Sequence, residues 1–112
     1  MDVDQRAVGN VVVAKPLERR LDARSAPEFK AAMARLVRDG HARIVLDLSD
    51  VEFVDSSGLG AIVSALKQVA GTGDLVLCGT RPAVMSMFKL TRLDKVFQMF
   101  ALADDAVAAL AS

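Results

Sequence analysis

The residues best placed to do chemistry form one short segment of the chain, Asp55-Ser56-Ser57-Gly58-Leu59-Gly60. It lies where an apolar, strand-like stretch gives way to a stripe of apolar residues at helical spacing. Backbone N–H groups at the start of a helix have no partner within it, and the helix dipole places partial positive charge there. We predict Ser56 as the N-cap. A hydroxyl displayed here can accept a phosphate without loss of the fold, because a helix start favours an anion.

Two glycines in the first turn of this predicted helix require an explanation. Gly58 and Gly60 each lower the helix propensity by about 1 kcal/mol relative to alanine. Close approach of a second backbone would explain them, since glycine has no side chain to obstruct it. The simpler alternative is that Asp55 and Ser56 only cap the helix, a common use of these residues. The segment itself leaves both interpretations open.

Other arrangements of reactive residues are weaker. Ser56 and the single histidine, His41, invite comparison with a hydrolase triad, but the surrounding residues do not form the G-x-S-x-G elbow, and a whole strand separates the two. Asp47, Asp50 and Asp55 alternate between strand and turn positions, which does not favour a metal site. We therefore expect no catalytic residues, no metal and no cofactor.

Length and composition exclude several classes of protein. A chain of 112 residues has the size of one domain, and we assign residues 1–112 to it. The 53% apolar and 25% charged residues exclude disorder caused by low hydrophobicity. Fourteen basic residues balance fourteen acidic ones, and neither Trp nor Tyr occurs, so we expect no nucleic-acid binding. The neutral charge also makes a monomer the expected state.

Cysteine content and hydropathy bear on the compartment. Cys78 is the single cysteine, which excludes an intramolecular disulfide and a cysteine-rich zinc site. The N-terminus shows no positive leader followed by an apolar stretch. Apolar runs reach at most six residues, far fewer than the ~20 that span a bilayer. We expect a cytoplasmic protein that does not enter a membrane.

Hydrophobic periodicity and turn residues predict the elements of the N-terminal half. Strands over residues 3–8 and 11–15 flank the turn pair Gly9-Asn10 and form a hairpin. A helix follows, with Ser25 as N-cap and Glu28 completing a capping box, and it ends at Asp39-Gly40. Consecutive apolar residues over 44–48 predict a strand covered on both faces.

The C-terminal half alternates in the same way. The chain stays extended over residues 51–54, and a helix begins near Ser57. The remaining predicted elements are a strand over 75–78, a helix opening at 80–82, a short strand over 96–100 and a helix after Asp104-Asp105. A hairpin followed by helix–strand alternation predicts the α/β class, with a mixed sheet and about four helices packed against it.

The segment 55–60 in this position resembles the phosphorylation signature of the STAS family, specifically of the bacterial anti-sigma factor antagonists. The resemblance extends over roughly residues 8–110. Leu21-Asp22-Ala23, with Ala26 and Phe29, resembles the segment that leads into the first helix of the family. Residues 44–49 resemble the strand before the signature. One position departs from the family, because Arg19 stands where glycine is usual. We expect this difference to affect partner specificity more than the fold.

The resemblance implies a regulatory protein rather than an enzyme. An unphosphorylated antagonist binds an anti-sigma factor that is also a serine kinase of the histidine-kinase-like ATPase type, and this binding releases the sigma factor. Phosphorylation of the first serine of the signature, here Ser56, reverses the binding, and a metal-dependent serine phosphatase restores it. The partner-binding residues implied are Asp22, Asp55, Ser57, Gly58, Leu59 and Gly60. For Asp22, capping of a turn is an equal alternative.

Two other functions stay open at this point. The same fold can serve as a partner-switch adaptor that regulates secretion, a phosphatase or a transporter. It can also bind a nucleotide or another small anion, with the glycine-containing turn as the cradle.

Overall fold

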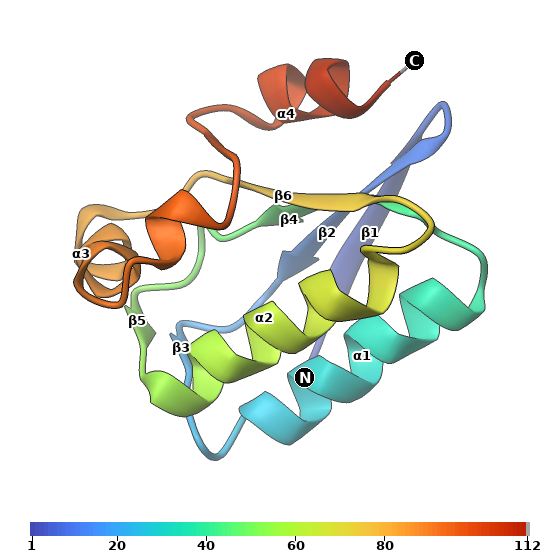
Figure 1. The fold of residues 1–112 in the computed structure, drawn as a ribbon. Coiled ribbons are helices and arrows are strands. Elements are labelled where there is room, and N and C mark those ends of the chain that lie inside the picture. Colours follow the sequence, from blue (N-terminus) through green and yellow to red (C-terminus); the bar gives the residue numbers. More distant parts are fainter. Residues whose placement is uncertain (112) are drawn as a thin grey trace.

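The computed structural model describes residues 1–111 and contains the N-terminal hairpin that the sequence predicts (Figure 1). Its strands are β1 (Val3–Val8) and β2 (Val11–Pro16), paired antiparallel. Gly9 opens the turn with a φ of 61°, a conformation that glycine adopts without strain.

A five-stranded sheet has the order β1-β2-β4-β6-β7, and β1 is its one antiparallel member. A separate two-stranded sheet pairs β3 with β5 in parallel. The strands not yet bounded are β3 (Arg20–Leu21), β4 (Arg43–Asp47), β5 (Phe53–Val54), β6 (Asp74–Cys78) and β7 (Met99–Phe100). The α/β class with a mixed sheet is thus confirmed.

Helices cover both faces of the large sheet, and the described residues form four α-helices, as predicted. The bounds are α1 (Ala26–Arg38), α2 (Ser56–Val69), α3 (Pro82–Leu90) and α4 (Ala103–Leu110), with a 3-10 turn η1 (Leu93–Lys95). The helices α1 and α2 lie side by side on one face, and α4 lies on the other (Figure 1). None of the helices in the described part of the chain is long and apolar enough to cross a membrane.

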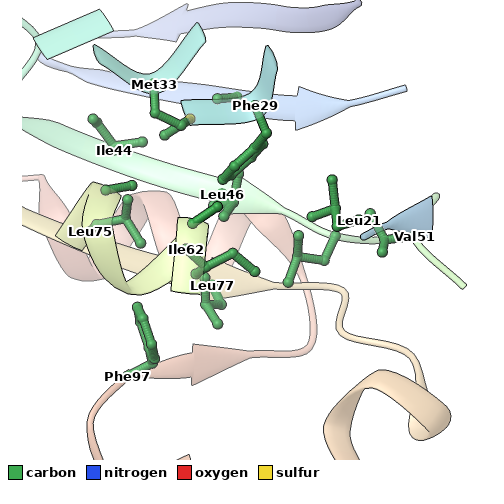
Figure 2. Packing of buried hydrophobic residues seen from close by; sticks show 14 of the residues in the cluster. Leu21, Phe29, Met33, Ile44, Leu46, Val51, Ile62, Leu75, Leu77 and Phe97 are labelled. Atoms are coloured by element: carbon green, nitrogen blue, oxygen red, sulfur yellow. The ribbon is translucent and has the colours of Figure 1, made fainter. Parts of the chain in front are cut away.

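The consecutive apolar residues of the central strands are explained by these two layers. Ile44 and Leu46 of β4 point to the layer that contains Phe29, Met33 and Ile62 (Figure 2). Strand residues that point the other way pack in a second cluster with Ala106 of α4: Val11, Val13, Val45, Val76 and Cys78. Among residues 1–111 no charged or polar residue is buried as a whole, so the interior is filled mainly by apolar packing.

The predicted capping box of α1 is wrong, although the N-cap position is right. Ser25 is the N-cap, but its backbone is already helical and its side chain makes no cap bond. Instead, Ser25 Oγ accepts a hydrogen bond from Asp22 N and donates one to the Arg20 carbonyl. Glu28 pairs with the N-terminal amine of Met1. Ser25 thus bonds within the turn before α1, whereas Glu28 bonds to the first residue of the chain.

The last strand is shorter than the predicted 96–100. The chain first forms η1, and Phe97 N donates to the Leu93 carbonyl at 3.1 Å. This turn brings the Phe97 ring edge-on to Phe88, with 5.8 Å between the ring centroids. Burial of Phe97 in the core therefore outweighs extension of the strand.

Candidate functional site

The short parallel pair β3–β5 brings two distant loops together. Leu21 is paired with Val54, so the residues that follow each strand, Asp22 and Asp55, leave the pair at the same end. Asp55 N donates to the Leu21 carbonyl at 3.1 Å and continues this pairing by one step. The start of α2 is thus fixed against the segment that leads into α1.

Asp55, not Ser56, is the N-cap of α2, which corrects the sequence prediction. Its backbone is extended, with φ −101° and ψ −173°, and its Oδ1 accepts from Gly58 N at 3.0 Å. Its Oδ2 accepts from Ala23 N at 3.2 Å. One carboxylate therefore caps the helix and also ties the 21–23 segment to it. Because Asp55 occupies the cap, Ser56 becomes the first residue of the helix.

Ser56 is consequently left with a free hydroxyl. The residue is exposed, and within residues 1–111 its Oγ has no hydrogen-bond partner. It lines a groove of about 470 Å³ between α2 and the α3–η1 segment. The groove is lined by Ser56, Leu59, Gly60, Val63, Ser64, Lys67, Thr91 and Leu93. A nucleophilic oxygen is thus presented to solvent beside a mostly apolar surface.

The two glycines of the first turn have different surroundings. A Cβ on Gly58 would lie 2.1 Å from the Leu21 carbonyl oxygen, so Gly58 permits a close approach within the chain itself. A Cβ on Gly60 would meet nothing within 4 Å. Gly60 is exposed, whereas Gly58 and Leu59 are buried. Of these three, only Gly60 offers open space to another molecule.

Residues 5–106 match the profile of the STAS domain family. The chain belongs to the STAS family. An anti-sigma-B factor antagonist of Listeria monocytogenes is 32% identical over 81 residues, which cover 70% of each chain. A homologous antagonist of Staphylococcus aureus is 30% identical over 74 residues, covering 65% of this chain and 68% of the relative. The crystal structure of an anti-sigma factor antagonist from Mycobacterium paratuberculosis superposes with a TM-score of 0.88 at 28% identity, covering 97% and 92% of the two chains.

Asp22 caps a turn in this STAS domain. Its Oδ1 accepts from Arg24 N at 3.1 Å and from Ser25 N at 3.3 Å, and its Oδ2 accepts from Arg20 Nε at 3.3 Å. Loss of hydration raises the pKa of Asp22, but these hydrogen bonds outweigh that effect and leave the pKa below its usual value. The carboxylate remains partly accessible beside the start of α2. Its role in capping a turn is evident, and a role in partner binding stays a prediction.

Ser57 faces a different surface of the STAS domain from Ser56. With Gly60 it lines a groove of about 450 Å³ between α1 and α2, whose other lining residues are Ala23, Ala26, Pro27 and Lys30. The two adjacent serines therefore face two grooves, and Gly60 borders both. This arrangement makes the two hydroxyls distinguishable to a partner.

Arg19 and its neighbour Arg20 make contacts that the sequence did not predict. Arg19 Nε pairs with Glu52 at 2.9 Å, which keeps the pKa of Glu52 below its usual value. The Arg20 guanidinium lies over the Phe53 ring, 4.2 Å from its centroid. Both contacts hold the 19–20 segment against the 52–53 segment. The departure from the usual glycine at Arg19 is thus accommodated by an ion pair on the surface.

The other candidates from the sequence do not converge on Ser56. His41 precedes β4, whereas Ser56 follows its far end, so the length of this strand separates them. Asp47 Oδ1 accepts from Ser49 N at 2.9 Å, and Asp50 lies 3.6 Å from Lys15 Nζ. Across the described residues 1–111, no group of three or more potential ligands is arranged to hold a metal ion.

Proposed function

We propose that this STAS protein is an anti-sigma factor antagonist controlled by reversible phosphorylation of Ser56. The observation that carries the proposal is the free, exposed Ser56 hydroxyl next to the N-cap Asp55. The unmodified protein binds an anti-sigma factor that is also a serine kinase, and a metal-dependent serine phosphatase reverses the modification. The kinase step consumes ATP, and we therefore propose a cytoplasmic location for the protein.

The names of similar proteins support the same function. Both the Listeria and the Staphylococcus relatives are named anti-sigma-B factor antagonists, and each alignment covers about two thirds of both chains or more. An anti-sigma factor is therefore the expected partner. The family is regulatory, and we propose no catalytic role for any residue of the site.

Phosphorylation at Ser56 acts on the interface rather than on the fold. A phosphate adds about −1.5 to −2 charge at neutral pH. The start of α2 tolerates this charge because of the helix dipole. A partner packed over the site, however, has to desolvate the phosphate beside Asp55, whose carboxylate is already held by two backbone amides. A penalty of about 3 kcal/mol weakens binding more than a hundredfold.

Nucleotide binding by the turn itself has less support. A cradle for an anion needs free backbone N–H groups, and Asp55 Oδ1 already accepts from Gly58 N. The carboxylate also repels an incoming phosphate.

An adaptor function without a sigma factor uses the same surface. The two functions are separated by identifying the other protein that the kinase binds, which is a sigma factor only in the proposed function.

The decisive experiment is phosphorylation by the cognate kinase with ATP, followed by mapping of the modified residue. We expect a single phosphate on Ser56. The Ser56→Ala variant should accept no phosphate. Ser57→Ala, the matched control one residue away, should be phosphorylated to the same extent as the wild type. Phosphate on Ser57 alone, or on another element, would overturn the assignment.

A further inference from the structure

The edge strand β1 has an open side. It is the edge strand of the sheet (Figure 1). Every residue of β1 except Val3 is exposed. Leu17 N donates to the Asp2 carbonyl at 2.9 Å. Hydrogen-bonded and non-bonded pairs alternate in an antiparallel ladder, so the even-numbered residues of β1 direct their backbone groups to β2. The N–H and C=O groups of Val3, Gln5 and Ala7 therefore point to the open edge.

The charges on this strand are arranged symmetrically about Gln5. Asp4 and Arg6 are both exposed, and neither forms an ion pair within residues 1–111. They project from the same face of the sheet, opposite Lys15 and Val13 of β2. An acidic and a basic residue therefore lie at equal distances on either side of the residue whose backbone groups face outward.

We propose that β1 is a self-complementary edge that pairs antiparallel with β1 of a second copy of this chain. With the two-fold axis at Gln5, the outward-facing Gln5 residues pair with each other, and Val3 pairs with Ala7 of the second copy. Asp4 then lies opposite Arg6 of the second copy in a non-hydrogen-bonded pair, where side chains approach most closely. The two-fold axis repeats each of these contacts, which closes the dimer.

Charge selects this register over its neighbours. A shift by two residues still allows the outward backbone groups to meet. One such shift places Asp4 opposite Asp4 of the second copy, with Asp2 opposite Arg6, and the other places Arg6 opposite Arg6. Only the register centred on Gln5 opposes no like charges. Directly opposed like charges are destabilising. The charged pair thus protects the edge against other strands, as edge charges commonly do, but attracts a second copy in one register.

The resulting dimer replaces the monomer expected from the neutral charge. A single strand pair without an apolar core lies at the weak end of protein interfaces, and we expect a dissociation constant of about 0.1 mM. The proposal is independent of Ser56 and of the proposed function, because no residue of the site belongs to β1.

Sedimentation equilibrium of charge variants tests the pairing. We expect the dimeric fraction of the wild-type protein to increase as its concentration is raised. Asp4→Arg and Arg6→Asp should each remain monomeric, because each opposes like charges in the dimer. A mixture of these two variants should form heterodimers, since every pair is then complementary. The double variant D4R/R6D should dimerise like the wild type, which also controls for the new arginine beside Lys15.

Three results would overturn the proposal. A wild-type protein that stays monomeric up to about 1 mM, well above the expected dissociation constant, excludes the dimer. Single variants that dimerise like the wild type place the interface elsewhere. Folded monomeric single variants whose mixture fails to associate refute the register, with circular dichroism as the control for folding.

Discussion

A Cβ on Gly58 would lie only 2.1 Å from the carbonyl oxygen of Leu21. The backbone of Gly58 in the first turn of α2 therefore packs closely against that of Leu21 in β3, although the two residues are far apart in the chain. The same Leu21 carbonyl accepts the Asp55 N–H at 3.1 Å. The backbone of one residue thus determines both how close α2 approaches and where it begins.

This relationship predicts opposite outcomes for the two glycines. Gly58→Ala should lower the free energy of unfolding by about 3 kcal/mol or more, because rigid backbone atoms have to move. Gly60→Ala, the matched control, should raise it by about 0.5–1 kcal/mol through helix propensity, because its Cβ meets nothing within 4 Å. Urea denaturation measures both. Equal destabilisation would contradict the close approach at Gly58.

Gly60→Ala also reports on the partner surface. A methyl group there fits the domain, so any loss of affinity for the anti-sigma factor arises from contact with the partner. We expect binding at least tenfold weaker than that of the wild type. Unchanged affinity in calorimetry would place Gly60 outside the interface.

The charge mechanism at Ser56 predicts different affinities for two substitutions. Ser56→Ala should bind the anti-sigma factor as the wild type does and resist release in the presence of ATP. Ser56→Asp should bind at least tenfold more weakly, since it introduces a negative charge beside Asp55. Its thermal stability should not fall, because an acidic residue in the first turn is favourable. Equal affinities of the two variants would refute the mechanism.

Local sequence signals located the elements well. Gly9-Asn10, Asp39-Gly40 and the apolar spacing of the helices act over a few residues, and the structure places turns and helices there. The exact cap of α2 was not predictable in the same way. Asp55 and Ser56 both have cap chemistry, and the choice depends on the extended backbone of Asp55, which β3 imposes through Leu21.

Contacts between distant segments account for the other differences. The spacing of Ser25 and Glu28 is that of a capping box, but Asp22 and the N-terminal amine compete successfully for the two side chains. Nothing in the sequence near Gly58 indicated that Leu21 fills the space above it. The close approach of a second backbone, one of the two explanations offered for that glycine, is therefore confirmed, and the parallel pairing of β3 with β5 identifies this backbone as that of Leu21.

Asp55 should stabilise the domain through two hydrogen bonds. Asp55→Ala removes the carboxylate oxygens that accept hydrogen bonds from Gly58 N and Ala23 N. We expect the free energy of unfolding to fall by about 1–2 kcal/mol. Asp55→Asn, the matched control, retains one acceptor oxygen for the cap and should lose less. The comparison is made by urea denaturation at neutral pH. An alanine variant as stable as the wild type would show that the cap is dispensable.

Cys78 predicts a pH dependence at the alkaline end. Burial, followed by the negative charge of Asp47, raises the pKa of this thiol from 9.0 to about 12. The unfolded chain therefore loses the thiol proton at lower pH than the folded one. Stability from the neutral thiol is complete below pH 9 and is lost as the pH rises towards 12.

The expected slope of this loss is about 1.4 kcal/mol per pH unit, the value for one proton. It is measured as the difference between the wild type and Cys78→Ala, which cancels the titration of the lysines. The chain contains no tyrosine, so no phenol titrates in this window. The same burial should keep Cys78 unreactive towards iodoacetamide until the protein unfolds. A wild type and an alanine variant with parallel pH profiles, or rapid alkylation of the folded protein, would contradict the buried neutral thiol.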